Sequence, residues 1–285
     1  KVLMPLLVIL SVVIAVFVVT RPGAGAGISY YLKPDLSKIS ANAFLAALGQ
    51  LFYSISLAMG IMITYGSYLK KDANIEHSVR NIEIFDTGIA FLAGLMIVPA
   101  VFVFSGGNEA SLKAGPTLMF ITLPKVFDSM AGGHIIGAVF FVLVLFAALT
   151  SAISLMETVV SIFVDKTNKS RRFITICVTI YTIVMAIPSS LGFGVLSGIS
   201  IKGMSILDMF DFVSNSILMP VVALLTCLFV GFVVKPKTVI DEVERSSHSF
   251  KSKKVYEILI KYVSPILIIL ILISSILNAF GINTL

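Results

Sequence analysis

The sequence predicts an all-α integral membrane protein with seven membrane-spanning helices. Of its 285 residues, 58% are hydrophobic and only 13% are charged, whereas a soluble domain carries about 25% charged residues. The mean hydropathy of +1.04 is equally high. Apolar runs long enough to cross the hydrocarbon core as a helix, about 20 residues, recur along the whole chain. We therefore expect a bilayer to surround this protein.

The predicted spans divide residues 1–285 into one transmembrane domain. They lie at about residues 2–20, 43–69, 82–104, 134–164, 173–191, 207–234 and 256–280. The segment 105–133 holds a further apolar stretch, 117–127, which is too short to span a bilayer. This stretch is either a re-entrant, lid-like hairpin over the outer mouth or an interfacial helix.

The distribution of basic residues orients the spans. The second, fourth and sixth loops hold thirteen Lys and Arg, and the first, third and fifth hold six. Because cytoplasmic loops carry the excess of Lys and Arg, we expect the N-terminus of the chain inside and its C-terminus outside, in the plasma membrane. The same distribution explains the net charge of +6, so this charge does not indicate nucleic-acid binding.

Other residue types exclude further classes of site. Cys177 and Cys227 both lie in apolar runs and imply no disulfide framework. The three histidines are isolated, and no Cys/His spacing typical of a bound metal occurs.

The second predicted span is unusual at its centre. In Gly49–Tyr68 (GQLFYSISLAMGIMITYGSY), every second residue from Ser54 to Gly60 is small, and two of them carry hydroxyls. Polar, weakly helix-forming residues at mid-bilayer are costly. In membrane transporters such a break exposes backbone groups that bind ions and substrate. The sequence therefore predicts a broken helix near residues 54–60.

The fourth span carries hydroxyl groups on one face. Ala147, Thr150 and Ser151 are spaced i, i+3, i+4 in FAALTSAISLMETVV. Their oxygens could bind a small cation, or the small side chains could simply allow close helix packing. Asp86, at the start of the third span, is either a solvated interfacial carboxylate or a fixed charge for a cation.

Further acidic residues lie at or near the ends of spans. Asp165 ends the fourth span, and Asp208 and Asp211 begin the sixth, where acids complement a helix N-terminus. Such residues are most often solvated. Glu157 lies deeper and requires a partner or access to water.

Three longer motifs carry a family resemblance: GQLFYSISLAMGIMITYGSYLKKDANI, LPKVFDSMAGGHIIGAVFFVLVLFAALTSAISLMETVV and ILDMFDF. They resemble the bacterial branch of the neurotransmitter:sodium symporters, whose inverted-repeat architecture is a known transporter pattern. By resemblance the chain corresponds to helices five to eleven, which include the second inverted repeat and flanking helices. Helices one to four of the same protein are then missing partners.

The resemblance implies roles for individual residues. Tyr53 would cover the substrate, and Ser54, Ser56, Met59, Ser151 and Leu155 would contact it. Two sodium sites, each incomplete in this chain, would use the following residues: Ser54 and Asp86 for one, and Ala147, Thr150 and Ser151 for the other. Asp211 would be an extracellular gate and Asp165 a cytoplasmic gate, each paired with an arginine in the missing part, and Tyr68 would belong to the cytoplasmic gate.

Departures from the family pattern concern ion and substrate choice. Asp86 stands where many relatives have Asn, and Ala90 where relatives have Glu or Ser. Asp86 is therefore expected to supply the negative charge that chloride or Glu supplies elsewhere, so chloride is not expected. Met59 replaces a frequent aromatic residue, and because Met is adaptable, the pocket should accept several hydrophobic amino acids.

The function that the sequence predicts is sodium-coupled symport of a neutral or hydrophobic amino acid by alternating access. A non-transporting amino-acid receptor on the same fold is the alternative. An intramembrane enzyme is disfavoured, because Ser151 has no His or Lys nearby in the sequence and no metal cluster is present. The chain begins at Lys1 and reads as a fragment without its N-terminal part.

Overall fold

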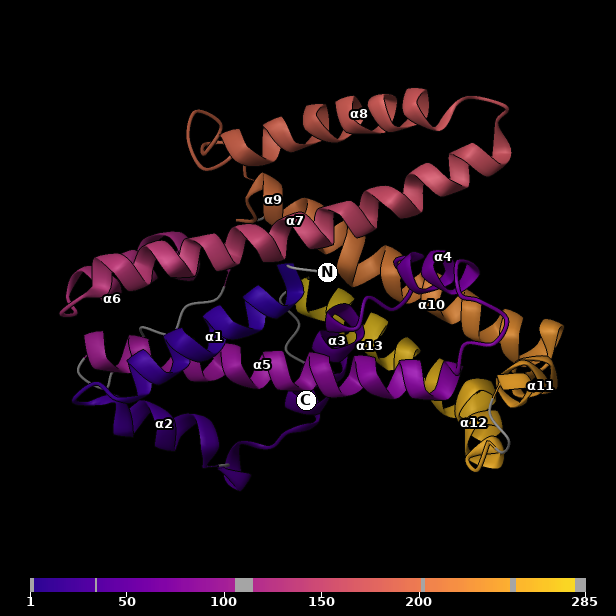
Figure 1. The fold of residues 1–285 in the computed structure, drawn as a ribbon, viewed down its shortest axis with the longest axis horizontal. Coiled ribbons are helices and arrows are strands. Elements are labelled where there is room, and N and C mark those ends of the chain that lie inside the picture. Colours follow the sequence, from indigo (N-terminus) through magenta and orange to yellow (C-terminus); the bar gives the residue numbers. More distant parts are fainter. Residues whose placement is uncertain (1–2, 34, 106–114, 201–202, 247–249, 280–285) are drawn as a thin grey trace. The chain divides into compact units, whose positions relative to one another are not determined.

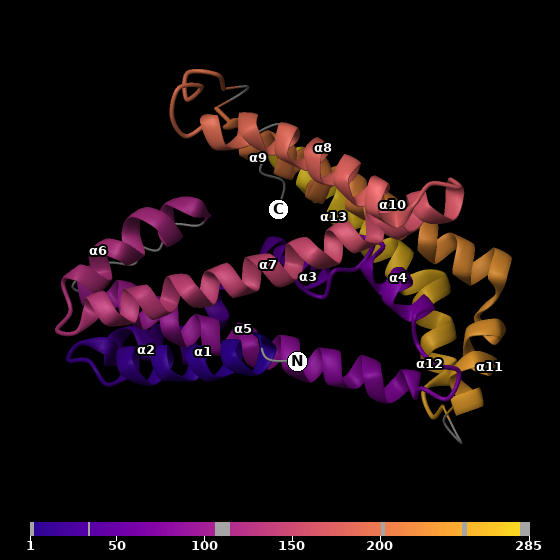
Figure 2. The same cartoon turned by 45° about the horizontal axis from the view of Figure 1, so that its top comes forward.

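The computed structural model describes residues 3–33, 35–105, 115–200, 203–246 and 250–279. All regular secondary structure in these residues is helical. The chain divides into two compact units, of which unit 1 holds Lys1–Lys38 and Ile82–Ala152 and unit 2 holds Ile39–Asn81 and Ile153–Leu285. Figures 1 and 2 show the helices from two directions.

Unit 1 is built around an apolar core. It contains α1 (Leu3–Val19), α2 (Ala24–Leu32), α6 (Leu123–Asp128), most of α5 (Ile75–Ser105) and the first part of α7 (Gly133–Lys166). Seven core side chains from four of these helices are at most 2% exposed, namely Ile14, Val18, Ala100, Val101, Leu123, Val126 and Phe140. The burial of these side chains stabilises unit 1.

Helix α2 lies in a segment that hydropathy assigns to a loop. It follows α1 after a bend of 118°, which Gly23 allows with a φ of +88°. A Cβ atom at Gly27 would lie 2.6 Å from Pro99 Cα. The absence of a side chain at Gly27 therefore lets α2 pack directly against α5.

Unit 2 is organised around a helical hairpin. Its first arm is the continuous helical segment Ile206–Val234, which includes α9 (Ile206–Asp211) and α10 (Met219–Leu228), and its second arm ends in α13 (Ser264–Ala279). Helix α10 packs against α13, and α13 also contacts α3 (Ala41–Ser54). Unit 2 also contains the first part of α5 and the second part of α7. Its other helices are α4 (Ile61–Ser67), α8 (Arg171–Leu191), α11 (Pro236–Ser246) and α12 (Lys253–Ile258).

Three prolines follow π-helical turns. The N–H groups of Leu123, Met219 and Ser264 each donate to a carbonyl five residues earlier, and the next residue in each case is Pro124, Pro220 or Pro265. Proline has no N–H and its ring clashes with the carbonyl four residues before it. A π turn widens the helix at that point, so these helical segments continue through their prolines.

Five helical segments of the described chain are long and apolar enough to cross a membrane. They are Ile75–Ser105, Gly133–Lys166, Arg171–Leu191, Ile206–Val234 and Lys253–Asn278. A sixth arises if α1 and α2, which are bent against each other, form one span. The region 43–69 consists of two shorter helices, α3 and α4, so the count of seven spans stays a prediction.

One helix begins earlier than hydropathy predicts. Helix α5 begins at Ile75, seven residues before the predicted span at 82, because helical hydrogen bonding continues where the apolar run stops. The segment 105–133 holds the predicted apolar stretch 117–127, and its residues 106–114 lie outside the described residues. The apolar stretch is one helical run, which is π-helical at Leu118–Thr122 and continues as α6. The Phe127 ring packs against Phe140, with centroids 5.4 Å apart.

Candidate functional site

The backbone leaves the helical conformation between α3 and α4. Helix α3 ends at Ser54 and α4 begins at Ile61. Between them Ser56, Ala58 and Gly60 have φ values of 57°, 60° and 78°. For a residue with a side chain, this left-handed conformation costs about 1–2 kcal/mol. Such strain persists only where the surroundings impose it, and it clusters at functional sites.

Hydrogen bonds hold the break in a defined shape. The N–H of Leu57 donates to Phe52 O at 3.1 Å, and the N–H of Ser56 donates to Tyr53 O at 3.0 Å. Helix α4 starts with the bond from Thr64 N–H to Gly60 O, 2.9 Å long. Ser54 is exposed, and Ser56 and Met59 are half-buried. The candidate substrate-binding residues of this segment thus lie at or within an ordered turn between two helices.

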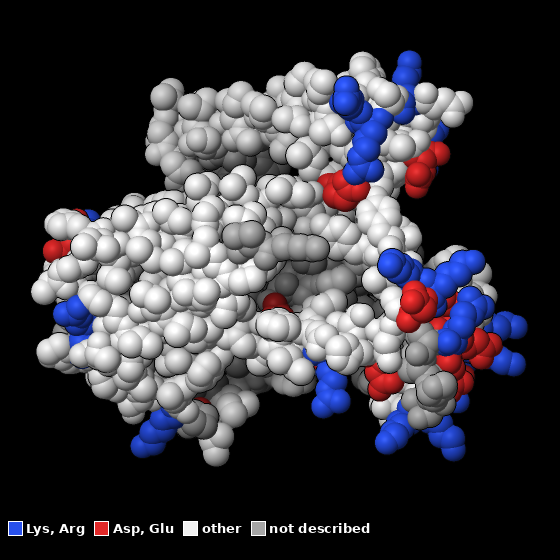
Figure 3. Space-filling model, in the orientation of Figure 1, with Lys and Arg blue, Asp and Glu red and all other residues white. Residues whose placement is uncertain are grey.

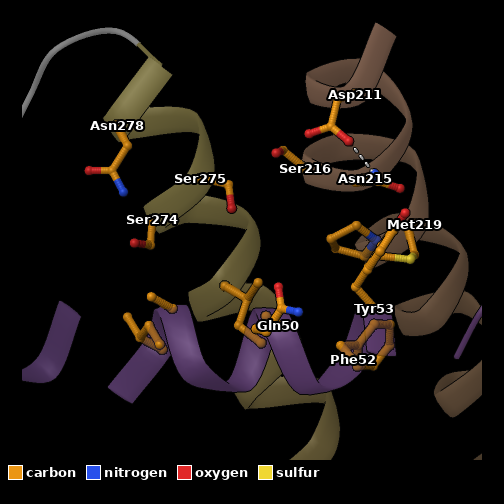
Figure 4. Close-up of a pocket in the computed structure, with 15 residues that line it drawn as sticks. Gln50, Phe52, Tyr53, Asp211, Asn215, Ser216, Met219, Ser274, Ser275 and Asn278 are labelled. Atoms are coloured by element: carbon orange, nitrogen blue, oxygen red, sulfur yellow. Dashed lines mark hydrogen bonds between the residues drawn. The ribbon is translucent and has the colours of Figure 1, made fainter. Parts of the chain in front are cut away.

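A polar pocket of about 420 Å³ lies within unit 2 (Figure 4). Helices α3 and α13 and the segment from α9 to α10 all contribute to it. Its polar lining residues are Gln50, Tyr53, Asp211, Asn215, Ser216, Ser274, Ser275 and Asn278. A pocket with a few convergent polar groups is the usual form of a small-molecule site.

This pocket brings together two residues that the sequence assigns to the outer side of the substrate path. Tyr53 stands near the end of α3 and Asp211 at the end of α9, and both line the pocket. Asn215 Nδ2 donates to Asp211 Oδ1 at 2.5 Å, the dashed line in Figure 4. This bond leaves the carboxylate able to accept from other donors.

The candidate sodium ligands on α7 include two adjacent oxygens. Thr150 Oγ1 lies 3.1 Å from Phe146 O and 2.9 Å from Ala147 O and donates toward both. A hydroxyl has a single proton, so at any moment Thr150 donates a hydrogen bond to only one of these two carbonyls. The other carbonyl oxygen then accepts no hydrogen bond from Thr150. Thr150 and Ala147 are half-buried and Ser151 is exposed. Carbonyl and hydroxyl oxygens therefore meet on one side of α7, and such oxygens suit a hard cation.

The other predicted residues are spread over both units. Asp86 is half-buried on the part of α5 that belongs to unit 1, whereas Ser54 belongs to unit 2. Leu155, on α7, is 46% exposed and stands one turn beyond Ser151. Asp165 is exposed near the C-terminal end of α7. Across the described residues, no group of three or more His, Cys, Asp or Glu could hold a metal ion.

A side-chain network connects α4 with α7 and α8. Tyr68 OH donates to Glu157 Oε1 at 2.6 Å, and the Arg171 guanidinium pairs with Glu157 Oε2. One turn earlier on α7, Ser154 Oγ accepts from Tyr65 OH at 2.8 Å. The Glu157 side chain is only 20% exposed, so its carboxylate depends on these two partners.

The family resemblance assigned a gate role to Tyr68 but did not indicate its partners. The signal for Glu157 was present, because an acid deep in an apolar helix requires a partner. The partners themselves lie 89 residues before it and 14 residues after it in the chain, and no local pattern connects them. Asp165 is not part of this network.

Comparisons with known proteins show the family of this chain. Residues 1–283 match the model of the sodium:neurotransmitter symporter family. An uncharacterized sodium-dependent transporter of Haemophilus influenzae is 39% identical over 279 residues, which cover 96% of this chain and 59% of that protein. An uncharacterized sodium-dependent transporter of Bacillus subtilis is 34% identical, with 96% of this chain and 60% of that protein covered.

A solved structure shows the same fold. The crystal structure of MhsT in complex with L-phenylalanine superposes with a TM-score of 0.84 at 36% identity, covering 96% of this chain and 62% of that one. The fold and the family match are therefore those of a multi-pass membrane protein of the transporter class. It belongs to the sodium:neurotransmitter symporter family, as its motifs predict. It spans about 60% of the length of these relatives.

Proposed function

We propose that the complete protein takes up a neutral or hydrophobic amino acid together with sodium by alternating access. The break between α3 and α4, with Ser56 and Ala58 in the left-handed conformation, carries the proposal. Half-helix ends and unwound backbone at bilayer depth are what transporters use to bind substrates and ions. MhsT, a relative of the same fold, was solved with L-phenylalanine, which supports the substrate class.

The proposed substrate contacts surround the break and α7. Tyr53 covers the substrate, and the other contacts come from Ser54, Ser56, Met59, Ser151 and Leu155. The exposed position of Tyr53 on the polar pocket supports its role as a lid, because a lid must meet both the substrate and the outer solution.

Two sodium ions would be bound beside the substrate. Ser54 and Asp86 contribute to one site, and Ala147, Thr150 and Ser151 to the other, with the remaining ligands supplied by helices that precede this chain. When Thr150 Oγ1 donates its proton to Phe146 O, its lone pairs and those of Ala147 O can both face an ion. The contacts of Thr150 Oγ1 with Phe146 O and Ala147 O support this arrangement.

Coupling requires that ions and substrate bind one conformation better than the other. Asp211 would close the outer side, and Asp165 and Tyr68 the cytoplasmic side. We add Glu157 and Arg171 to the cytoplasmic set, since they hold Tyr68 in place. Movement of α4 during opening would then break this network.

The membrane arrangement completes the proposal. We infer seven spans that correspond to helices five to eleven of the family fold, including its second inverted repeat. The N-terminus of the chain would lie in the cytoplasm and its C-terminus outside, in the plasma membrane.

The sodium assignment is tested by Thr150→Ala and Ser151→Ala in the complete protein. Loss of one ion ligand, worth about 1.5–3 kcal/mol, raises the sodium concentration for half-maximal substrate binding roughly tenfold or more. Thr182→Ala on α8 is the matched control, because Thr182 also donates to a carbonyl four residues earlier. Sodium titrations of labelled amino-acid binding provide the measurement, and curves that match the unsubstituted protein would refute the assignment.

The dependence of uptake on chloride gives a second test. Asp86 supplies a fixed negative charge beside the first sodium site, so uptake should need no chloride. Uptake into proteoliposomes is compared in sodium chloride and in sodium gluconate. A loss of uptake in gluconate would contradict the role proposed for Asp86.

A further inference from the structure

Residues 235–261 connect the two long arms of the unit 2 hairpin, and we call them the α11–α12 elbow. Ile206–Val234 precedes the elbow, and Lys253–Asn278 overlaps its end. Both segments are long and apolar enough to span a membrane, and α10 packs against α13. Because the chain leaves the hydrocarbon after one arm and enters it again in the next, the elbow must lie at a membrane surface.

Charged side chains gather on this elbow (Figure 3), over α11 and α12 as labelled in Figure 1. Seven of them are basic, namely Lys235, Lys237, Arg245, Lys251, Lys253, Lys254 and Lys261. Four are acidic, namely Asp241, Glu242, Glu244 and Glu257. The elbow therefore carries an excess of positive charge at the level of lipid headgroups.

Internal ion pairs use only some of the basic groups. Lys253 Nζ lies 2.5 Å from Glu244 Oε1 and Lys261 Nζ lies 2.7 Å from Glu257 Oε1, while Arg245 pairs with Glu242 at 3.0 Å. In the described part of the elbow, the remaining lysines have no ion-pair partner. These are Lys235, Lys237, Lys251 and Lys254.

Tertiary contacts hold the described residues of the elbow on both sides of residues 247–249. Glu244 accepts from the N–H of Phe250 at 3.4 Å as well as from Lys253, and Val243 is only 7% exposed. Hydrogen bonding from Lys253 holds the pKa of the Glu244 carboxyl below its ordinary value. The rings of Phe250 and Tyr256 meet edge to face with centroids 6.1 Å apart. The unpaired lysines therefore project from a fixed frame.

A shallow pocket of about 310 Å³ begins beside one of these lysines. Lys254, Ile258 and Tyr262 line this pocket at intervals of four residues along one helical segment. Glu257 and Lys261, which pair with each other, line it as well. Ile258 is 55% and Tyr262 58% exposed. Tyrosine favours the membrane–water interface, so this pocket places a cationic group beside an apolar and an interfacial side chain. A phospholipid headgroup and the first part of its acyl chain require this combination.

We propose that the α11–α12 elbow binds anionic phospholipid. The phosphate group lies against Lys251 and Lys254, and the acyl chain runs along Ile258 and Tyr262. Clusters of Lys and Arg immediately beside a membrane span attract anionic headgroups in this way. The proposal does not depend on which amino acid the protein carries or on the side of the membrane at which the elbow lies.

The test uses the full-length protein in detergent and native mass spectrometry. Binding of phosphatidylglycerol is compared with that of phosphatidylcholine with the same acyl chains. The double variant Lys251→Gln/Lys254→Gln should lose about 25-fold in phosphatidylglycerol affinity, from roughly fivefold per lysine, and should lose no phosphatidylcholine affinity. Raised salt should weaken phosphatidylglycerol binding to the unsubstituted protein.

The control Lys33→Gln/Lys125→Gln removes the same charge from exposed positions outside the elbow and should bind both lipids as the unsubstituted protein does. Lys251→Arg/Lys254→Arg, which keeps the charge, should retain binding even if the Gln variant unfolds more easily. Equal affinity of the unsubstituted protein for the two lipids would overturn the proposal. So would equal losses in the elbow and control variants, or loss of binding in a folded Arg variant.

Discussion

The chain between α3 and α4 and the chain before Pro220 both interrupt a regular α-helix, but they leave different backbones. From Ser54 to Ile61 the residues leave the helical region, and two non-glycine residues adopt positive φ. From Phe212 to Leu218 the helix only widens into a π turn, and the residues that flank it keep helical dihedral angles. The first interruption releases backbone hydrogen-bonding groups, whereas the second keeps them paired within the helix.

This difference shows that proline is not what opens a helix here. Pro124, Pro220 and Pro265 each follow a π turn in a continuing helical segment. The opened segment contains no proline, and small residues occupy every second position from Ser54 to Gly60. In a membrane, unpaired backbone groups cost several kcal/mol each, so an opened helix indicates function more strongly than a proline does.

The largest effect is expected where the break meets α7. Gly60→Ala places a side chain at φ +78°, and its Cβ would lie 2.8 Å from Thr158 Cγ2. Together, backbone strain and overpacking should cost about 2–3 kcal/mol of unfolding free energy. Thermal unfolding in detergent and uptake in proteoliposomes would both show the loss.

Gly66→Ala is the control for this change, because Gly66 has no positive φ and nothing lies within 4 Å of its Cβ position. Adding Thr158→Ser to Gly60→Ala removes the clashing methyl group and should recover part of the stability. Equal effects of the two glycine substitutions would show that the conformation of the break is not imposed by its surroundings.

The next effect concerns how α4 is held after the break. Arg171→Gln leaves the partly buried Glu157 carboxylate with Tyr68 as its remaining partner, at a cost of about 1–3 kcal/mol. Adding Glu157→Gln should restore much of this stability, because the uncompensated charge is removed. Arg172→Gln, at the exposed neighbouring position, should change the unfolding temperature little, and a loss as large as that of Arg171→Gln would contradict the network.

A smaller effect tests strain within the break itself. Ala58→Gly relieves a left-handed alanine, which offsets the entropy cost of glycine, so stability should stay constant or rise by up to about 1 kcal/mol. Ala47→Gly, at an exposed helical position in α3, should instead lower it by about 1 kcal/mol. Denaturation curves should therefore show a loss of stability for Ala47→Gly and none for Ala58→Gly, and an equal loss in both variants would contradict the strain at Ala58.

The smallest effect is expected at the proline-linked turn. Pro220→Ala should change the unfolding free energy by less than about 1 kcal/mol, because the π turn already accommodates the ring and most of the roughly 3 kcal/mol penalty is avoided. Hydrogen exchange of the Met219 amide would show whether its bond to Ser214 survives. A loss as large as that of Gly60→Ala would remove the distinction between the two interruptions.

Much of the fold is readable from local sequence. Hydropathy places the long apolar helices, and the small residues from Ser54 to Gly60 indicate the interruption that the structure contains. Hydropathy missed α2, whose AGAGISYYL sequence is rich in glycine. This helix depends on the close contact of Gly27 with Pro99, which no local pattern reveals.

The candidate site, like the fold, was predictable from the sequence only in part. The spacing of Thr150 and Ser151 left cation binding and helix packing both open, and the family resemblance indicated their sodium role as well as the roles of Tyr53 and Asp211. The pocket that Tyr53 and Asp211 share with α13 was not predicted, because Ser274, Ser275 and Asn278 carry no motif. The partners of Glu157 were not predicted either, because no local pattern connects it with Tyr68 or Arg171.

The sequence by itself determined that this protein is a multi-pass helical membrane protein of a sodium symporter family, because hydropathy and motif content are local properties of a chain in a bilayer. Only the tertiary structure decided that Tyr68 and Arg171 satisfy Glu157, that Tyr53 and Asp211 line one pocket, and that α2 is a helix. These features depend on contacts between residues far apart in the chain, which form only when the helices pack.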